Sequence, residues 1–130
     1  MISDGRNTYS IVGFPSFHNH SYFDPRTNAY KLTGKSLNVS LAINGRALTK
    51  AGDVIFVAGE PMKFDKPTWQ KYVAAYNGEL GGSLIAISAT DGKELGKHKL
   101  DAAVVWDSIV VSNDQLYLSL VDGTILCFGK

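Results

Sequence analysis

The sequence has little net charge and no long apolar stretch, and both absences narrow the range of functions. Thirteen basic and twelve acidic residues leave a formal charge of +1, too small for a stripe that neutralises phosphates, so we expect no nucleic-acid partner. No run approaches the ~18 apolar residues of a spanning helix, so we expect no membrane span. The first residues lack the apolar core of a signal peptide, which leaves the compartment open.

Cysteine and histidine are also scarce, which limits nucleophilic and metal chemistry. The one cysteine, Cys127, lies in an apolar stretch, where we interpret it as a small buried hydrophobic residue rather than a nucleophile or disulfide partner. His18 and His20 have the spacing of a metal-binding pair, but His98 is distant in the sequence and metal sites usually need three or four protein ligands. Turn formers flank the pair, so we expect a loop there and no metal site.

What the chain does contain is an internal repeat. Residues 51–58, Ala-Gly-Asp-Val-Ile-Phe-Val-Ala, return 61 positions later as residues 112–119, Ser-Asn-Asp-Gln-Leu-Tyr-Leu-Ser. A second shared segment follows in each copy, at residues 82–87 and 123–128, and these two segments are 41 positions apart. The first copy therefore carries an insertion of 20 residues. Repetition on this scale indicates a repeat architecture.

A weaker third copy lies near the start of the chain. Residues 5–10 precede residues 52–57 by 47 positions, which places Tyr9, Phe56 and Tyr117 at one repeat position. A period of about 40–45 residues is what four short strands and their turns need in one blade of a β-propeller.

Short apolar runs between turn residues predict an all-β fold. Asp91-Gly92 and Asp122-Gly123 predict hairpin tips of two residues or close to it, because glycine tolerates positive φ and Asp-Gly suits the primed turns.

Three of the apolar runs hardly alternate with polar residues. Residues 54–57, 84–87 and 116–120 are apolar almost throughout, which predicts strands buried on both faces. Sheets stacked face to face, as in a propeller, provide that environment.

The insertion contains the one good helix candidate. Four apolar side chains recur at helical spacing: Trp69, Tyr72, Val73 and Tyr76. We predict a helix over residues 66–77, with Asp65 as its N-cap, Pro67 in its first turn and Gly78 as its stop. The aromatic stripe could be a ligand platform, but we favour its being the face that packs the helix onto the sheets.

Residues 83–95, Ser-Leu-Ile-Ala-Ile-Ser-Ala-Thr-Asp-Gly-Lys-Glu-Leu, closely resemble the repeat of the PQQ-like (quinoprotein-like) β-propellers. Residues 106–129 look like the final blade of such a protein, and the resemblance covers residues 42–130 and, more loosely, 2–13. It implies a bacterial extracytoplasmic setting such as the periplasm. The family includes both quinone-dependent dehydrogenases and cofactor-free scaffolds, so the resemblance implies a fold more than a chemistry.

Two departures from the family pattern bear on that choice. Gly96 stands where many members carry a tryptophan that docks one blade on the next, so this contact must be made differently. The dehydrogenases place adjacent cysteines at the PQQ cofactor and a Glu/Asn/Asp set around calcium, whereas this chain has one cysteine and none of those ligands maps onto it. We therefore expect no cofactor in this chain.

Together these features predict a partial β-propeller of two to three four-stranded antiparallel blades with one short inserted helix. Residues 1–41 form a blade remnant in this interpretation, residues 42–101 a blade with the insertion, and residues 102–130 a final blade without its outer strand. Because a ring needs at least about four blades to close, we expect the others to come from upstream sequence, another chain or further copies of this one.

The predicted function is a non-catalytic binding or scaffold module within a larger protein. The alternative is a fragment of a PQQ-dependent dehydrogenase, with PQQ and calcium held by blades outside this chain. Peptide recognition by strand addition at an exposed blade edge is a third reading, within the binding class. Glu94, Asp101 and Asp107 could be grouped for acid–base catalysis, but their places beside strand starts and turns indicate solvated edge residues.

Overall fold

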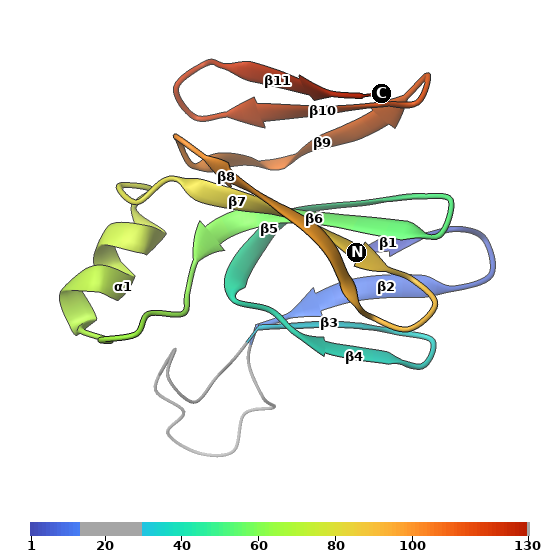
Figure 1. The fold of residues 1–130 in the computed structure, drawn as a ribbon, viewed down its shortest axis with the longest axis horizontal. Coiled ribbons are helices and arrows are strands. Elements are labelled where there is room, and N and C mark those ends of the chain that lie inside the picture. Colours follow the sequence, from blue (N-terminus) through green and yellow to red (C-terminus); the bar gives the residue numbers. More distant parts are fainter. Residues whose placement is uncertain (14–29, 130) are drawn as a thin grey trace.

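The computed structural model describes residues 1–13 and 30–129, and it is all-β apart from one short helix. Three antiparallel sheets lie one above another (Figure 1). The first sheet consists of β1 (Ile2–Ser3), β2 (Thr8–Val12), β3 (Lys31–Gly34) and β4 (Leu37–Ser40). The middle sheet consists of β5 (Ile43–Ala51), β6 (Val54–Pro61), β7 (Gly82–Ser88) and β8 (Glu94–Leu100). The third sheet consists of β9 (Val104–Ser112), β10 (Gln115–Leu120) and β11 (Ile125–Phe128).

Within each sheet the strands follow chain order, and every neighbouring pair is antiparallel. The strands of the three sheets fall within residues 1–41, 42–101 and 102–130 respectively. The all-β prediction with one short helix is thus confirmed. In the part of the chain that the structure describes, no helix is long and apolar enough to cross a membrane.

The middle sheet is apolar on both faces and separates two layers of the core. The layer between the first and middle sheets includes the middle-sheet residues Ile55, Val57, Ile85 and Ile87. The layer between the middle and third sheets includes Ala58 and Leu84, with Phe56 packed against it. Because successive side chains of a strand point to opposite faces, an apolar run of this kind serves both layers. The predicted double burial is confirmed for residues 54–57 and 84–87.

The same prediction is wrong for residues 116–120. Leu116, Leu118 and Leu120 are buried against the middle sheet, whereas Tyr117 is 37% exposed on the opposite face. The reason is that no described residue forms a further sheet over that face. β10 is therefore buried on one side only.

The two predicted hairpin tips have longer connections than two residues. Five residues join β7 to β8 around Gly92, and four join β10 to β11 around Gly123. Both glycines have positive φ, +76° and +89°, so their conformational role is as predicted while the loop lengths are not. The aspartates Asp91 and Asp122 close these loops by accepting hydrogen bonds from backbone N–H groups two residues on, at 3.1 and 2.9 Å.

Two-residue tips occur instead inside the repeated segments 51–58 and 112–119. Asn113 and Asp114 join β9 to β10 with φ of 52° and 60°, the left-handed pair of a type I′ turn. Gly52, at φ +55°, starts the equivalent tip between β5 and β6. The pairs Gly52-Asp53 and Asn113-Asp114, inside the repeated segments, were the sequence signal for these turns.

The helix α1 (Trp69–Tyr76) lies inside the predicted range but begins later. Thr68, and not Asp65, is the N-cap: its hydroxyl accepts a hydrogen bond from the Lys71 N–H at 3.4 Å. Gly78 follows the helix at φ +82°, as expected of a stop. Figure 1 shows α1 beside the stack of sheets rather than between two of them.

The predicted packing face of α1 is only partly correct. Tyr72 and Ala75 are buried, but Trp69 and Tyr76 are 63% and 59% exposed and Val73 is 41% exposed. The helix therefore anchors through one aromatic residue and one alanine, and most of its apolar stripe faces a hollow described below.

Candidate functional site

The three repeat aromatics point in one direction along the stack. The sheets stack in the order first, middle, third. In each sheet, we call the side that points in the direction from the first sheet to the third the forward face, and we call the other side the back face. Tyr9 lies on the forward face of the first sheet, covered by the middle sheet and 2% exposed. Phe56 lies on the forward face of the middle sheet and packs into the layer under the third. Tyr117 lies on the forward face of the third sheet, where no described residue covers it.

The repeat also relates the residues that pair with these aromatic residues on the neighbouring strands. In the middle sheet, Phe56 pairs with Thr49 on β5 and with Ala86 on β7. In the third sheet, Tyr117 pairs with Val110 on β9 and with Cys127 on β11, and each is displaced by the repeat offset of its strand. Directly paired residues share a face. The row around Phe56 in the middle sheet is therefore covered by the third sheet. The equivalent row around Tyr117 in the third sheet is not covered by any described residue.

The row of Tyr117 is apolar, and its neighbours on the same face are mixed, since Gln115, Ser112 and Ser119 are polar and Ile125 is apolar. Val110 is 55% exposed, Ile125 is 69% exposed, and Cys127 is also exposed. Together with Tyr117 these residues define what we call the open face. The prediction that Cys127 is buried is wrong, because β11 turns its alternate residues outward and nothing described lies over them. An apolar patch of this kind on a sheet commonly marks an interaction surface.

The other end of the stack is polar. The back face of the first sheet carries hydroxyl, amide and ammonium groups from Thr8, Ser10, Lys31, Thr33, Asn38 and Ser40. Its one apolar member among the paired residues is Val12, 43% exposed. In stacked repeats a polar outer face suits the end that meets water. The described stack thus has one polar end and one end with an exposed apolar row of Val110, Tyr117 and Cys127.

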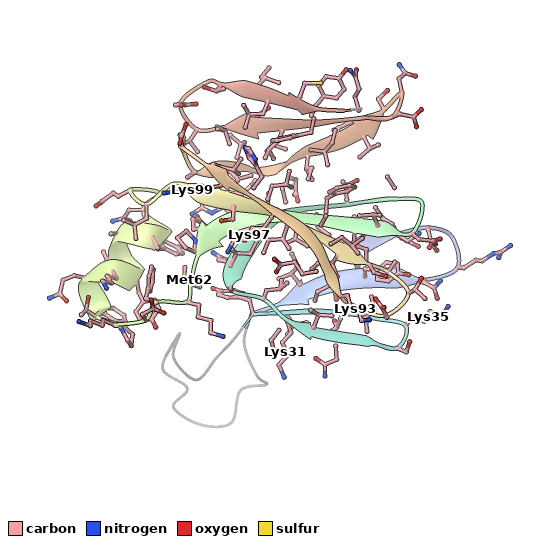
Figure 2. All side chains as sticks on the ribbon, viewed as in Figure 1. Lys31, Lys35, Met62, Lys93, Lys97 and Lys99 are labelled. Atoms are coloured by element: carbon pink, nitrogen blue, oxygen red, sulfur yellow. The ribbon has the colours of Figure 1, made fainter. Side chains whose placement is uncertain are left out.

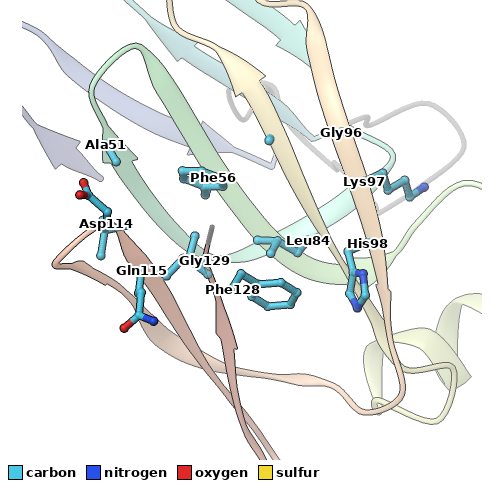
Figure 3. A pocket seen from close by; sticks show the side chains of 13 residues that line it. Ala51, Phe56, Leu84, Gly96, Lys97, His98, Asp114, Gln115, Phe128 and Gly129 are labelled. Atoms are coloured by element: carbon cyan, nitrogen blue, oxygen red, sulfur yellow. The ribbon is translucent and has the colours of Figure 1, made fainter.

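A hollow of about 460 Å³ opens between the middle and third sheets beside β8 and β11. Figure 3 shows Phe56 and Leu84 on its middle-sheet wall and Phe128 on its third-sheet wall. The ring of His98, on β8, meets that of Phe128 edge to face with centroids 5.1 Å apart. Gly96 contributes no side chain, and a Cβ built there would have no other atom within 4 Å. The hollow is therefore apolar and open at the edge of the sheets.

The edge strands beside this hollow differ in charge. β8 carries Glu94 and three flanking or internal lysines, of which Lys97 and Lys99 are seen along it in Figure 2. β11 has the sequence Ile-Leu-Cys-Phe and carries no charge. Charged side chains, lysine above all, are a common protection of sheet edges against pairing with another strand. The charges of β8 therefore protect it against pairing with another strand, whereas β11 lacks such charges.

A second hollow, of about 600 Å³, lies against α1 and is lined by Trp69, Val73 and Tyr76 of the helix and by Trp106 of β9. The Arg46 guanidinium sits 5.2 Å from the ring centroid of Trp106 and 5.9 Å from that of Tyr76. It also donates a hydrogen bond to the Tyr76 carbonyl oxygen at 2.9 Å. Arg46 therefore connects the middle sheet, the helix and the third sheet.

The partner of Arg46 is the carboxylate of Glu60, which is fully buried. Burial raises the pKa of Glu60, and the nearby Arg46 offsets only part of that rise. Burial also raises the pKa of Tyr30, with a smaller contribution from the negative charge of Glu60. The pair links β5 to β6, and burying its carboxylate has a large desolvation cost.

The residues singled out from the sequence are not brought together into a reaction centre. His18 and His20 lie outside the described residues, and His98 packs on Phe128. Among residues 1–13 and 30–129 no three metal-ligating side chains gather. Glu94, Asp101 and Asp107 are exposed at separate places along the chain. The exposed Asp91 and Asp122 have lowered pKa values chiefly because backbone N–H groups of Lys93 and Thr124 donate to them.

Sequence reasoning missed Arg46 and Glu60, which stand in the middle-sheet strands with no motif around them. The available signal was a glutamate at the end of an apolar strand, with an arginine in the preceding strand. In comparisons with known proteins, no family model, no curated protein and no solved structure matches the chain. The open face, the uncharged edge and the two hollows are therefore the features from which a function can be inferred.

Proposed function

We propose that this chain is a non-catalytic binding or scaffold module of the PQQ-like β-propeller type, within a larger extracytoplasmic bacterial protein. Its sheets are the blades of that architecture, and the open face is where the next blade or a partner chain packs. The resemblance of residues 83–95 to the family repeat supports the fold assignment. The three stacked antiparallel sheets are compatible with it.

One observation carries the proposal. The row of Thr49, Phe56 and Ala86 is covered by a sheet, and the equivalent row centred on Tyr117 is open and apolar. Three paired strands present a surface with an apolar centre of Val110, Tyr117 and Cys127, and such a surface is stabilised when another sheet packs on it at about 10 Å. A scaffold role follows from this geometry because the surface recognises another sheet rather than a small substrate.

The test is the association of the purified chain, measured by light scattering over a hundredfold range of concentration. We expect the mass to rise with concentration, since the open face is the apolar surface available for pairing. The variant Tyr117→Lys places a charge in the centre of that face and should remain monomeric. Asn38→Lys adds the same charge to the polar back face of the first sheet and should associate like the unmodified chain. A monomer at every concentration contradicts the proposal.

The dehydrogenase alternative has its own test. The complete protein is mixed with pyrroloquinoline quinone and calcium and then assayed for bound quinone absorbance and for dye-linked oxidation of alcohols or sugars. The scaffold proposal expects neither, and quinone binding with turnover would overturn it.

A further inference from the structure

We propose that the hollow against α1 binds a neutral oligosaccharide, with its sugar rings stacked on the exposed indoles of Trp69 and Trp106. This inference rests on the proposed function as a binding module and names the class of its ligand. The faces of a pyranose ring are apolar because they carry hydrogens on carbon, while its hydroxyl groups lie around the edge. Such a ligand needs aromatic rings beside hydrogen-bonding groups, and the hollow offers both.

The first support is the exposure of the aromatic rings. The chain has two tryptophans, and both line this hollow, one from α1 and one from β9. Trp69, Trp106 and the neighbouring Tyr76 are each more than half exposed. Tryptophan is highly buried on average in folded proteins, so two tryptophans exposed beside one hollow are unusual for packing residues. Their exposure leaves ring surface available to a ligand.

The second support is the backbone that positions Trp106. The next residue, Asp107, has a φ of 53°, an uncommon conformation for a residue with a side chain. The pairing of β9 with β10 also shifts register across residues 104–109. Bulges re-aim side chains and are over-represented next to active sites, where strained backbone is also concentrated. The irregular segment of β9 therefore holds Trp106 at the hollow at a cost in local strain.

The third support is the charge around the hollow. The Arg46 guanidinium packs against the rings of Trp106 and Tyr76, and its charge is balanced by the buried Glu60. None of the described residues that line the hollow has a charged side chain. A cationic ligand would compete with Arg46 for the ring faces, and an anionic ligand would find its charge already compensated. A neutral ligand fits this environment best.

The hydrogen-bonding groups and the size of the hollow define the ligand further. Asn44 and Tyr30 also line the hollow, and the amide and the hydroxyl can both donate and accept hydrogen bonds, as sugar hydroxyls require. The volume of about 600 Å³ lies in the range of small-molecule pockets. Glucose and N-acetylglucosamine in β-1,4 linkage have only equatorial ring substituents, so both faces of each ring are free to stack. The ligand class is therefore an oligosaccharide of these units.

The experiment is isothermal titration calorimetry of the purified chain with cellotetraose and with N-acetylchitotetraose. We expect at least one of them to bind with a Kd of about 1 mM or lower, whereas sorbitol, which has hydroxyl groups but no ring, should not bind. Trp69→Leu keeps an apolar side chain without a ring and should weaken binding about tenfold. Trp69→Phe keeps a ring and should retain most of the affinity. Because Trp69 is largely exposed, both variants should keep the circular dichroism spectrum of the unmodified chain.

Tryptophan fluorescence provides the second readout, because both tryptophans line the hollow. Binding should shift the emission maximum to shorter wavelength as the exposed indoles leave water. No binding of either oligosaccharide would overturn the inference. Binding without an emission shift, or equal binding by the Trp69→Leu variant, would also overturn it, since the sugar would then bind elsewhere. Tighter binding of an octaproline peptide than of both oligosaccharides would overturn it in favour of a proline-rich partner.

The inference can fail separately from the proposed function. Tyr117 lies on the open face and does not line this hollow, so the Tyr117→Lys variant should remain monomeric and still bind the oligosaccharide. The Trp69→Leu variant should lose most of its oligosaccharide binding and still associate like the unmodified chain. Each variant therefore tests one surface without changing the other.

Discussion

Removing the guanidinium of Arg46 should destabilise the protein in a pH-dependent way. The Glu60 side chain is 0% exposed, and the Arg46 side chain that pairs with it is 13% exposed. Breaking a buried ion pair by removing one partner costs about 3–5 kcal/mol, because the remaining charge is left without compensation. Arg46→Met keeps most of the side-chain volume, so we expect a loss of about that size in unfolding free energy at pH 8. This is a large part of the roughly 5–15 kcal/mol that holds a domain folded.

The sign of the pH dependence follows from the pKa of Glu60. Burial raises this pKa in the folded state, so the native protein binds the carboxyl proton more tightly than the unfolded chain does. The stability that the protonated form contributes is complete below the unfolded pKa and is lost as the pH rises through the folded one. Without Arg46 the folded pKa rises further, so the cost of Arg46→Met should be smaller at pH 5 than at pH 8.

Urea unfolding followed by circular dichroism measures both quantities. The double variant Arg46→Met with Glu60→Gln should recover most of the loss at pH 8, since its carboxamide carries no charge. An equal loss at pH 5 and pH 8, or no recovery in the double variant, would refute the reasoning.

Three further predictions concern the fold. Leu118→Ala, in a side chain that is 0% exposed, should lower the unfolding free energy by about 2–5 kcal/mol in the same urea assay, and an unchanged midpoint would count against the second core layer. Gly123→Ala should cost about 1–2 kcal/mol because its φ is +89°, while Gly96→Ala, at an open position without positive φ, should change stability by less than about 0.5 kcal/mol. Deleting residues 61–80 and rejoining the hairpin should leave the β signal in circular dichroism largely intact but lower the stability, because Met62 and Tyr72 belong to the first core layer, and collapse of the β signal would show that the sheets depend on the insertion.

The apolar runs predicted the positions of three strands. Residues 54–57, 84–87 and 116–120 lie in Val54–Pro61, Gly82–Ser88 and Gln115–Leu120. The reason is that hairpin strands depend on local signals, namely apolar runs and turn residues. The repeat phase of Tyr9, Phe56 and Tyr117 also had a structural counterpart, since all three lie on forward faces.

The candidate site was less predictable because burial depends on what covers a strand. The apolar run at 116–120 has the same composition as the run at 54–57, yet only the latter has a sheet on both sides. Cys127 is exposed for the same reason. The hollow lies at the edge of two sheets, with Gly96 among its lining residues, and a sequence pattern does not reveal which strands stand at an edge. The N-cap of α1 is Thr68 and not the predicted Asp65, because the helix begins at Trp69 and residues 66–68 lie before its first turn.

The reactivity of Cys127 tests the open face most directly, because it is the one cysteine of the chain and lies in the row of Tyr117. The rate of its reaction with a thiol-specific reagent is measured over the same concentrations as the light scattering. If another sheet packs on the open face, the rate should fall as the mass rises, and it should stay high in the Tyr117→Lys variant. A rate that does not change while the mass rises would place the contact elsewhere and contradict the role of the open face.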